Sequence, residues 1–316
     1  MTYVRFLHRM LLMFAFAGLF SLTLALDVRA QSYTITDLGT LSGQRSSNAQ
    51  DISDNGVVVG QSDGSNDYPF VWQSGLMMKI SPLPGGESGI SVALGVSNTG
   101  QVVGQSQTTP PAGQSYLQQA FSWQSGMTFA LPVLPDSSTS YAQKVNNSGQ
   151  IVGGAFTSDN YRAVLWQNGA VYDLGFPPNG GFDYSFAYGI NNQGFIVGAA
   201  DGPDGHIHPF LWTPTTTNGT SGTMTLIGPS EVGRDAFAYG INDKNQVVGS
   251  MFGSAFLYSN GTMQSLGVLS GDSSSTAFAI NNASQVVGTS YGTSTRRPFL
   301  YSNGTMTDLN TLEGIS

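Results

Sequence analysis

The stretch from Ala187 to Gly198 reads A-Y-G-I-N-N-Q-G-F-I-V-G, and it decides the fold because variants of it occur six times in the chain. Two short runs of β-branched and aromatic residues flank a turn of Asn, Asp and Gly, which is typical of a β-hairpin. We expect the last turn residue to adopt positive φ and to close a bulge. Consecutive copies are 44, 49, 45, 51 and 39 residues apart and end at Gly60, Gly104, Gly153, Gly198, Gly249 and Gly288.

Each hairpin is followed by two more predicted strands. The third strand reads P-F-V-W, A-F-S-W, A-V-L-W, P-F-L-W, A-F-L-Y and P-F-L-Y in turn. Phe210 and Trp212 share one side of this strand and Leu211 faces the other, which indicates burial on both faces. We interpret the aromatic series as core between neighbouring sheets; the alternative is a ring of ligand-stacking side chains. The series comprises Trp72, Trp123, Trp166, Trp212, Tyr258 and Tyr301.

Four short strands per repeat predict an all-β fold, a β-propeller of six complete four-stranded repeats. One extra N-terminal strand is expected, because Thr34–Gly39 matches the fourth strand but precedes the first repeat. Either a six-bladed ring carries a redundant strand, or the chain is a truncated seven-bladed ring, which we favour. The propeller is expected over residues 31–316 as one domain, with repeats at about 44–80, 81–130, 131–174, 175–227, 228–266 and 267–309.

The first 30 residues have the pattern of a secretory signal peptide. Arg5 and Arg9 precede a 17-residue apolar run, Met10 to Leu26, and Ala30 provides a small residue at the expected cleavage point. The alternative is a membrane anchor, for which the run is at the short limit. We therefore predict a secreted protein, extracellular or periplasmic, with no membrane insertion after cleavage.

Composition limits the function classes. The chain has 316 residues, 40% of them apolar and 9% charged, and it has no cysteine, which excludes disulfides and thiol catalysis. Without residues 1–30 it keeps 8 basic and 18 acidic residues, a net charge of −10. This charge would repel a phosphate backbone, so nucleic acid is not expected as a partner. No nucleotide-binding or hydrolase motif is present, and no cofactor is predicted.

The recurring pattern, A-Y-G-I-N-N-x-G-Q-V-V-G followed by H/A/P-F-L-W-x-N-G-T-M-T-D-L-G, resembles the HAF-repeat family of extracellular bacterial proteins. The resemblance covers Tyr33 to Leu309, and His208-Pro209-Phe210 is the copy nearest to the motif that names the family. It implies secretion and a repeat scaffold. It implies no established activity, so no catalytic residue is carried over.

The candidate ligand-binding face is the one that carries the connections of variable length. These link the second strand to the third and each fourth strand to the next repeat, and they emerge on the same face of a four-stranded blade. His206 and His208 are candidate metal ligands there, and an ordinary polar turn is the alternative. Arg296 and Arg297 are expected to be a solvated basic pair. The ligand-binding candidates are Phe182, Asp183, Tyr184, Asp201 and Asp204.

Three functions remain open. The first is a secreted, non-catalytic scaffold that binds a glycan or protein ligand through the variable face. The second is an extracellular polysaccharide-active enzyme that uses paired carboxylates, Asp201 with Asp183 or Asp204. The third is a structural matrix or adhesin component.

Overall fold

The computed structural model describes residues 35–87, 89–108, 117–181, 183–229 and 233–311. The predicted signal peptide lies outside these ranges. Within them the only helical element is the short 3-10 turn η1 (Leu309–Thr311), and no helix is long and apolar enough to cross a membrane. The rest of the secondary structure consists of 24 β-strands.

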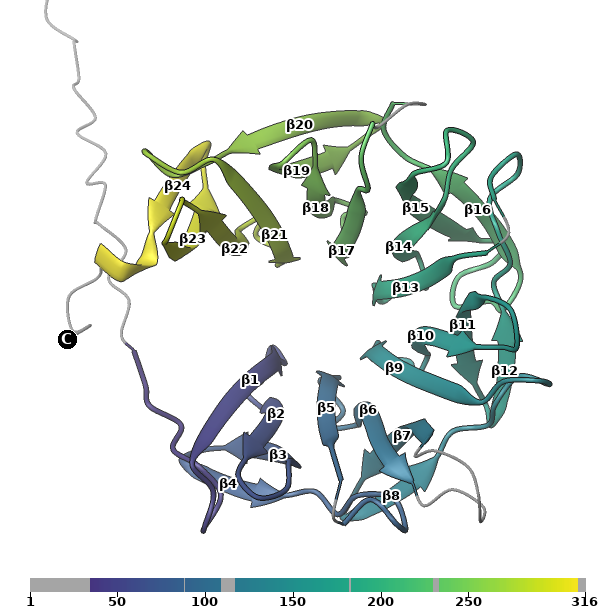
Figure 1. Cartoon of the computed structure of the whole chain (residues 1–316), viewed down its shortest axis with the longest axis vertical. Helices are drawn as coiled ribbons and strands as arrows, with labels where there is room; N and C mark the ends of the chain where they lie inside the picture. The colour runs from purple at the N-terminus through teal and green to yellow at the C-terminus, as the bar shows by residue number, and fades with distance from the viewer. Residues whose placement is uncertain (1–34, 88, 109–116, 182, 230–232, 312–316) are drawn as a thin grey trace, which may run out of the picture. The chain divides into compact units, whose positions relative to one another are not determined.

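The strands form six four-stranded antiparallel sheets, each a simple meander, and the sheets are arranged in a ring (Figure 1). The fold is therefore a six-bladed β-propeller, as the sequence predicts. The first strand of every blade is innermost and the fourth lies at the outer rim. Both termini of the described chain lie beside the same break in the ring.

The strand bounds follow the sequence repeats closely. Blade one contains β1 (Ser46–Ile52), β2 (Val58–Asp63), β3 (Tyr68–Gln73) and β4 (Leu76–Lys79). Blade two contains β5 (Ser91–Val96), β6 (Val102–Thr108), β7 (Leu117–Gln124) and β8 (Met127–Ala130). Blade three contains β9 (Thr139–Val145), β10 (Ile151–Phe156), β11 (Tyr161–Gln167) and β12 (Ala170–Asp173).

The second half of the ring has the same order. Blade four contains β13 (Ser185–Ile190), β14 (Ile196–Asp201), β15 (Ile207–Pro214) and β16 (Gly222–Leu226). Blade five contains β17 (Phe237–Ile241), β18 (Val247–Met251), β19 (Ser254–Ser259) and β20 (Thr262–Gly267). Blade six contains β21 (Ser274–Ile280), β22 (Val286–Tyr291), β23 (Arg296–Ser302) and β24 (Thr305–Asp308).

The hairpin turns have the predicted conformation. In blade one the N–H of Gly56 donates to the carbonyl of Ser53, and the N–H of Ser53 donates to the carbonyl of Val57. The residue equivalent to Gly56 has positive φ in every blade; in the last two it is Asn245 at 58° and Ser284 at 63°. A further bulge was not predicted: it interrupts the first strand of every blade, for example between Ala187 and Gly189.

The hydrophobic core lies between neighbouring blades, as expected for strands that are apolar on both faces. Val59 and Val71 of blade one pack with Ala93, Val102 and Phe121 of blade two, and all five are buried. Equivalent clusters fill the junctions farther along the ring. Burying each such valine or phenylalanine stabilises the fold by about 1.5–3 kcal/mol, so the blade junctions are the main source of stability.

The aromatic series of the third strands belongs to this core. Trp166 and Trp212 are each 2% exposed, and the indole N–H of Trp166 donates to the carbonyl of Pro132 at 2.7 Å. The remaining members are half-buried. The interpretation as core is therefore confirmed for Trp166 and Trp212, which leaves them no face for stacking a ligand.

The turns between first and second strands bind one another around the ring. In the turns of blades one to five the second residue donates its backbone N–H to the side chain of its counterpart in the next blade, at 2.8–3.0 Å. We call this series of contacts the turn latch. The recurrent Asn and Asp of the sequence therefore join blades as well as shaping turns. The latch comprises Asp54, Asn98, Asn147, Asn192, Asp243 and Asn282.

The extra N-terminal strand is not formed in the described residues. Residues 36–41 have no strand assignment and lie against blade one, where Leu38 and Leu41 pack with Val58 and Phe70. A fourth strand forms only against a third strand, and none precedes blade one in this part of the chain. This corrects the expectation for Thr34–Gly39.

Candidate functional site

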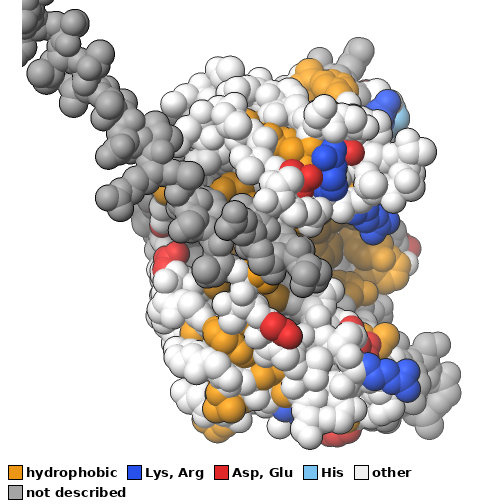
Figure 2. Space-filling view, turned by 90° about the vertical axis from the view of Figure 1, so that its left-hand side faces the viewer, with side chains coloured by type: hydrophobic (Ala, Val, Ile, Leu, Met, Phe, Trp, Pro, Cys, Tyr) orange, Lys and Arg blue, Asp and Glu red, His pale blue; other side chains and the backbone are white. Residues whose placement is uncertain are grey.

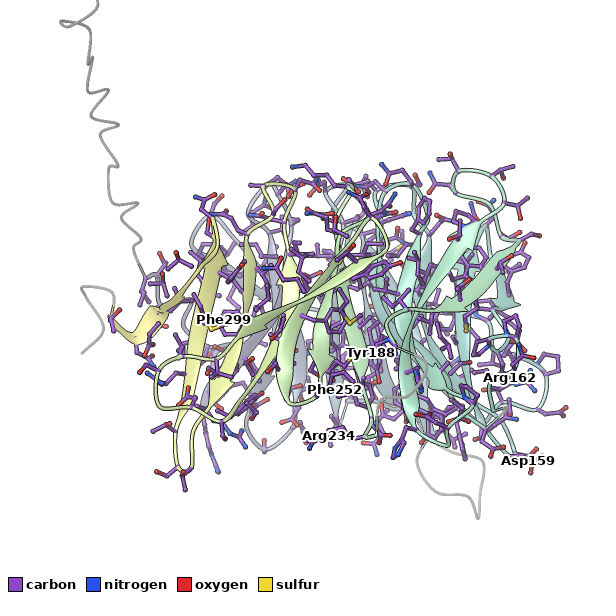
Figure 3. The ribbon with its side chains drawn as sticks, turned by 90° about the horizontal axis from the view of Figure 1, so that it is seen from above. Asp159, Arg162, Tyr188, Arg234, Phe252 and Phe299 are labelled. Atoms are coloured by element: carbon purple, nitrogen blue, oxygen red, sulfur yellow. The ribbon has the colours of Figure 1, made fainter. Side chains whose placement is uncertain are left out.

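The face that carries the variable connections contains the candidate site. In Figure 3, Asp159 and Phe252, from the connections between second and third strands, lie at the same rim as Arg234, from a connection between blades. Tyr188 lies deeper within the ring. The antiparallel meander forces this placement, because the second strand ends where the fourth strand also ends.

A row of aromatic side chains crosses the innermost strands of blades four to six. Tyr188, Tyr239 and Phe278 occupy the same position in three successive repeats. The ring centroids of Tyr188 and Tyr239 are 5.4 Å apart, and those of Tyr239 and Phe278 are 5.7 Å apart. These separations are typical of tilted aromatic pairs, so the three rings form a continuous surface.

The row continues onto the loop face. The hydroxyls of Tyr188 and Tyr184 are 2.8 Å apart, and the rings of Tyr184 and Tyr161 are 5.9 Å apart. Phe156 then packs against Tyr161 in a tilted pair, with ring centroids 4.7 Å apart. Phe278 at one end is 46% exposed and Tyr161 near the other is 38% exposed, so both ends reach solvent. We call this row the aromatic arc; it consists of Phe156, Tyr161, Tyr184, Tyr188, Tyr239 and Phe278.

Burial holds the phenols of Tyr184, Tyr188 and Tyr239 in the neutral form by raising their pKa values. Burial raises the pKa of Tyr239 to about 12, with a further contribution from the neighbouring Tyr188. Burial also raises the pKa of Tyr188 and of Tyr184 above the ordinary tyrosine value, although the hydrogen bond between the two hydroxyls partly offsets the increase at Tyr184. Each hydroxyl therefore remains able to donate and to accept a hydrogen bond.

A polar pocket of about 290 Å³ adjoins the arc on blade three. The connection between β10 and β11 forms one wall and leads directly into Tyr161. Three carboxylates and one guanidinium face the pocket, which provides hydrogen-bond acceptors and donors of both charges. The lining residues are Leu134, Pro135, Asp136, Thr157, Ser158, Asp159, Asn160, Arg162 and Asp173.

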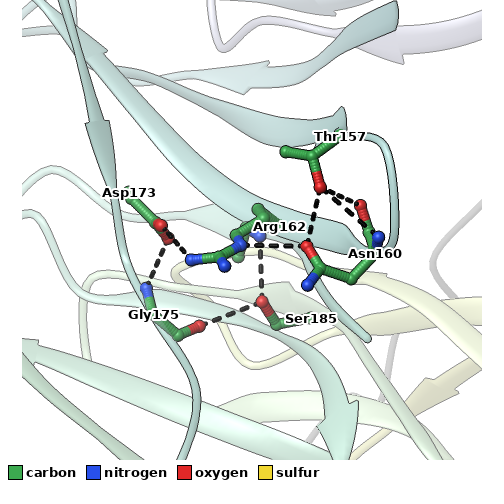
Figure 4. A network of polar contacts seen from close by, with 7 residues as sticks. Thr157, Asn160, Arg162, Asp173, Gly175 and Ser185 are labelled. Atoms are coloured by element: carbon green, nitrogen blue, oxygen red, sulfur yellow. Dashed lines mark hydrogen bonds and ion pairs between the residues drawn. The ribbon is translucent and has the colours of Figure 1, made fainter. Parts of the chain in front are cut away.

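Arg162 organises this pocket (Figure 4). Its Nη1 lies 2.6 Å from the Oδ2 of Asp173, and its Nε donates to the Oδ1 of Asn160 at 3.0 Å. The guanidinium also lies over the ring of Phe176, 5.1 Å from its centroid. The Oδ1 of Asp173 accepts from the N–H of Gly175, so the carboxylate that orients Arg162 is itself fixed.

The residues predicted to bind a ligand do not form one site in the described structure. Phe182 lies outside the described residues, and Tyr184 belongs to the aromatic arc. The Oδ2 of Asp201 accepts from the backbone N–H groups of Asp183 and Tyr184, at 3.0 and 2.9 Å. Asp201 therefore holds the loop that presents Tyr184, and its contact to Asp183 is through the backbone.

The predicted metal ligands point to different partners. The Nε2 of His208 lies 2.7 Å from the Oδ1 of Asp204, and its ring is buried, with no hydrogen-bond partner for Nδ1. His206 instead approaches Asp235, with 3.8 Å between Nδ1 and Oδ1. Among the residues described, no three His, Asp or Glu side chains are grouped so as to hold a metal ion. A metal at His206 and His208 stays a prediction.

Two features were missed from the sequence. The aromatic arc had a visible signal, since A-Y-G-I, A-Y-G-I and A-F-A-I place an aromatic residue at one repeat position. The expectation that Arg297 is merely solvated was wrong, because it pairs with Asp272 at 2.9 Å and with Asp308 at 3.1 Å. The Arg297–Asp308 pair is the counterpart in blade six of Arg162–Asp173 in blade three.

Comparison with known proteins shows the fold alone. No protein-family model matches the chain, and no curated protein matches its sequence. A puromycin-hydrolyzing peptidase of Mycobacterium tuberculosis is similar in structure, with a TM-score of 0.55 and 12% identity over 84% of this chain and 45% of that one. An acylaminoacyl peptidase of Pyrococcus horikoshii gives a TM-score of 0.49 and 11% identity over 86% and 46%. The chain thus spans less than half the length of either peptidase.

Proposed function

We propose that the protein is a secreted, non-catalytic binding propeller that holds a neutral polysaccharide on its variable face. The observation that carries the proposal is the aromatic arc, which reaches solvent beside a polar pocket. A sugar ring offers apolar C–H faces to aromatic side chains and hydroxyl groups to carboxylates, amides and guanidinium groups. The arc and the pocket supply both kinds of contact at adjoining positions.

The charges of the protein favour a neutral glycan over an acidic one. Three aspartates line the pocket against one arginine, and Asp173 already neutralises that arginine. The chain from residue 31 onward has a net charge of −10, which would repel a polyanion. The neutral phenols of Tyr184 and Tyr188 add hydroxyls without adding charge.

Secretion rests on the sequence pattern of residues 1–30, and it agrees with the resemblance to the HAF-repeat family. A scaffold that works outside the cell without disulfides depends on packing, which the blade junctions supply. Membership of that family is part of this proposal.

The alternative of a polysaccharide-active enzyme is weaker on geometric grounds. Asp201 is engaged by two backbone N–H groups and Asp204 by the imidazole of His208. Both carboxylates therefore serve the local loop structure. A reducing-end assay on the same mixtures of protein and polysaccharide distinguishes the two functions, because hydrolysis would release reducing ends.

The test is the binding of soluble neutral polysaccharides, such as xylan and β-glucan, by isothermal titration calorimetry. Tyr161→Ala removes an exposed ring of the arc and is expected to weaken binding about tenfold, or about 1.4 kcal/mol. Tyr172→Ala is the matched control, since Tyr172 is a tyrosine of similar exposure on the outer strand of the same blade. Equal losses in the two variants, or no binding by the wild type, would contradict the proposal.

A further inference from the structure

In the residues that the structure describes, the ring has a break between blade six and blade one (Figure 1), and blade six exposes a hydrophobic side chain beside this opening. Val287 lies on this surface and is 41% exposed. The residues at the same repeat position in the other blades are all 0% exposed, because each packs against the blade that follows. They are Val59, Val103, Val152, Val197 and Val248.

Blade one leaves the opposite surface uncovered. Ala49 is exposed, whereas its five counterparts are 0% exposed. Ile52 is 64% exposed, against 6% for Val96 and 7% for Val145 at the same position. Figure 2 looks toward this side of the molecule and shows hydrophobic side chains exposed on it. The counterparts of Ala49 are Ala93, Ala142, Ala187, Ala238 and Ala277.

The turn latch also stops at the opening. Asp243 donates its N–H to Asn282, but in the described residues no following turn offers a side chain to Asn282. At every earlier junction the next turn supplies an Asn or Asp oxygen. The opening therefore lacks a hairpin turn as well as apolar contacts.

Gly39 and Leu41, which precede blade one, make the same contacts with blade one that Gly267 and Leu269, at the end of the fourth strand of blade five, make with blade six. The carbonyl of Gly39 accepts from the hydroxyl of Ser47, as the carbonyl of Gly267 accepts from Ser275. The N–H of Leu41 donates to the hydroxyl of Ser62, in the same way that Leu269 donates to Ser290. The described residues at the opening therefore have the contacts that a fourth strand makes, without the three strands that would come before it in a blade.

We propose that the opening is a docking surface for a three-stranded antiparallel β-segment of the repeat's own sequence type. The segment contacts Val287 with one face and Ala49 and Ile52 with the other, and its third strand pairs with residues 36–39. Its first hairpin turn carries an Asn or Asp that accepts from the N–H of Asn282. A flat partner surface or a lipid surface cannot contact both walls of the opening at once.

The probe is a labelled peptide with the sequence of residues 268–304, which carries the first three strands of blade six and their turns. Fluorescence anisotropy measures its binding to the protein. A Val287→Asp substitution in the protein puts a charge on the docking wall and is expected to weaken the peptide Kd at least tenfold. Phe129→Asp is the matched control, because Phe129 is a 55% exposed aromatic residue on the outer strand of blade two and is expected to leave Kd unchanged.

A second measurement guards against self-association of the peptide. A variant with residues 268–304 appended after Ser316 supplies the segment in the same chain, and we expect its melting temperature to rise by at least about 5 °C. Adding Val287→Asp to that chain is expected to abolish the rise. The inference is overturned if neither the peptide nor the appended segment has an effect. It is also overturned if sedimentation equilibrium shows a dimer that Val287→Asp dissociates, since a second copy then covers the surface.

Discussion

Replacement of Asp243 by alanine tests whether the turn latch stabilises the ring. The Oδ1 of Asp243 accepts from the backbone N–H of Asn192 at 2.9 Å, and its Oδ2 accepts from the side-chain amides of Asn192 and Asn282, each at 3.0 Å. The substitution removes these three hydrogen bonds and so weakens the contacts of blade five with both neighbours, while the backbone N–H of residue 243 still donates to Asn282. Each bond in a half-buried place contributes about 0.5–1 kcal/mol, so we expect a loss of about 2 kcal/mol.

The matched control is Asp54→Ala in blade one. Asp54 is the same residue at the same repeat position, but its side chain accepts a single latch bond, from Asn98 at 2.7 Å. We expect the Asp54 variant to lose about a third as much free energy of unfolding. Urea denaturation followed by tryptophan fluorescence measures both losses, and Asp243→Ala should also lower the melting temperature by about 5 °C. Equal losses in the two variants would refute the reasoning, because the number of blade-to-blade bonds would not matter.

The difference between wild type and Asp243→Ala should depend on pH. Burial raises the pKa of Asp243, but hydrogen bonds from the backbone and side chain of Asn192 and from Asn282 outweigh it and hold the pKa below the ordinary value of 3.8. A group with a lowered pKa stabilises the fold fully above its unfolded value and loses that contribution as the pH falls through its folded value. The difference should therefore be constant above about pH 5 and shrink below pH 3.8.

Two further predictions concern packing and the arc. Val197→Ala should lower the free energy of unfolding by about 2 kcal/mol, whereas Val287→Ala should lower it by less than about 0.5 kcal/mol, because only Val197 is covered by a following blade. Urea denaturation of both variants measures the two losses, and equal losses would contradict the prediction. Because the pKa of Tyr239 is raised in the folded protein, its phenol ionises at lower pH in the unfolded chain than in the folded one, and the stability of the fold should fall as the pH rises from 10 to about 12. Thermal melts between about pH 9 and 12 should show a smaller loss of stability for Tyr239→Phe than for the wild type. An equal loss would show that other groups cause it.

The local chemistry of the repeats was enough to predict the blades. A turn such as Asn191–Gly194 sets positive φ at its end, and strands apolar on both faces require a sheet on each side. The turn conformation and the strand pattern both depend on neighbouring residues in the chain, so both can be predicted from the sequence. The core positions Phe210 and Trp212 follow from the same alternation.

The candidate site was only partly predictable. Tyr184 was recognised as a ligand-binding candidate from its loop, but the arc that includes it joins side chains from four blades. Asp201 looked like a ligand-binding carboxylate, and its two backbone hydrogen bonds appear only when the loop folds over it. Arg297 looked solvated because its partner Asp272 lies 25 residues away in sequence.

The sequence by itself determined that each repeat is a four-stranded sheet and which residues form its apolar faces. Only the tertiary structure decided which of those faces are covered. The motif Q-V-V-G occurs at residues 101–104, 246–249 and 285–288, yet its second valine is 0% exposed in Val103 and Val248 and 41% exposed in Val287. The reason is that a valine is buried by the blade beside it, and the residues of a single repeat do not specify whether that blade is present.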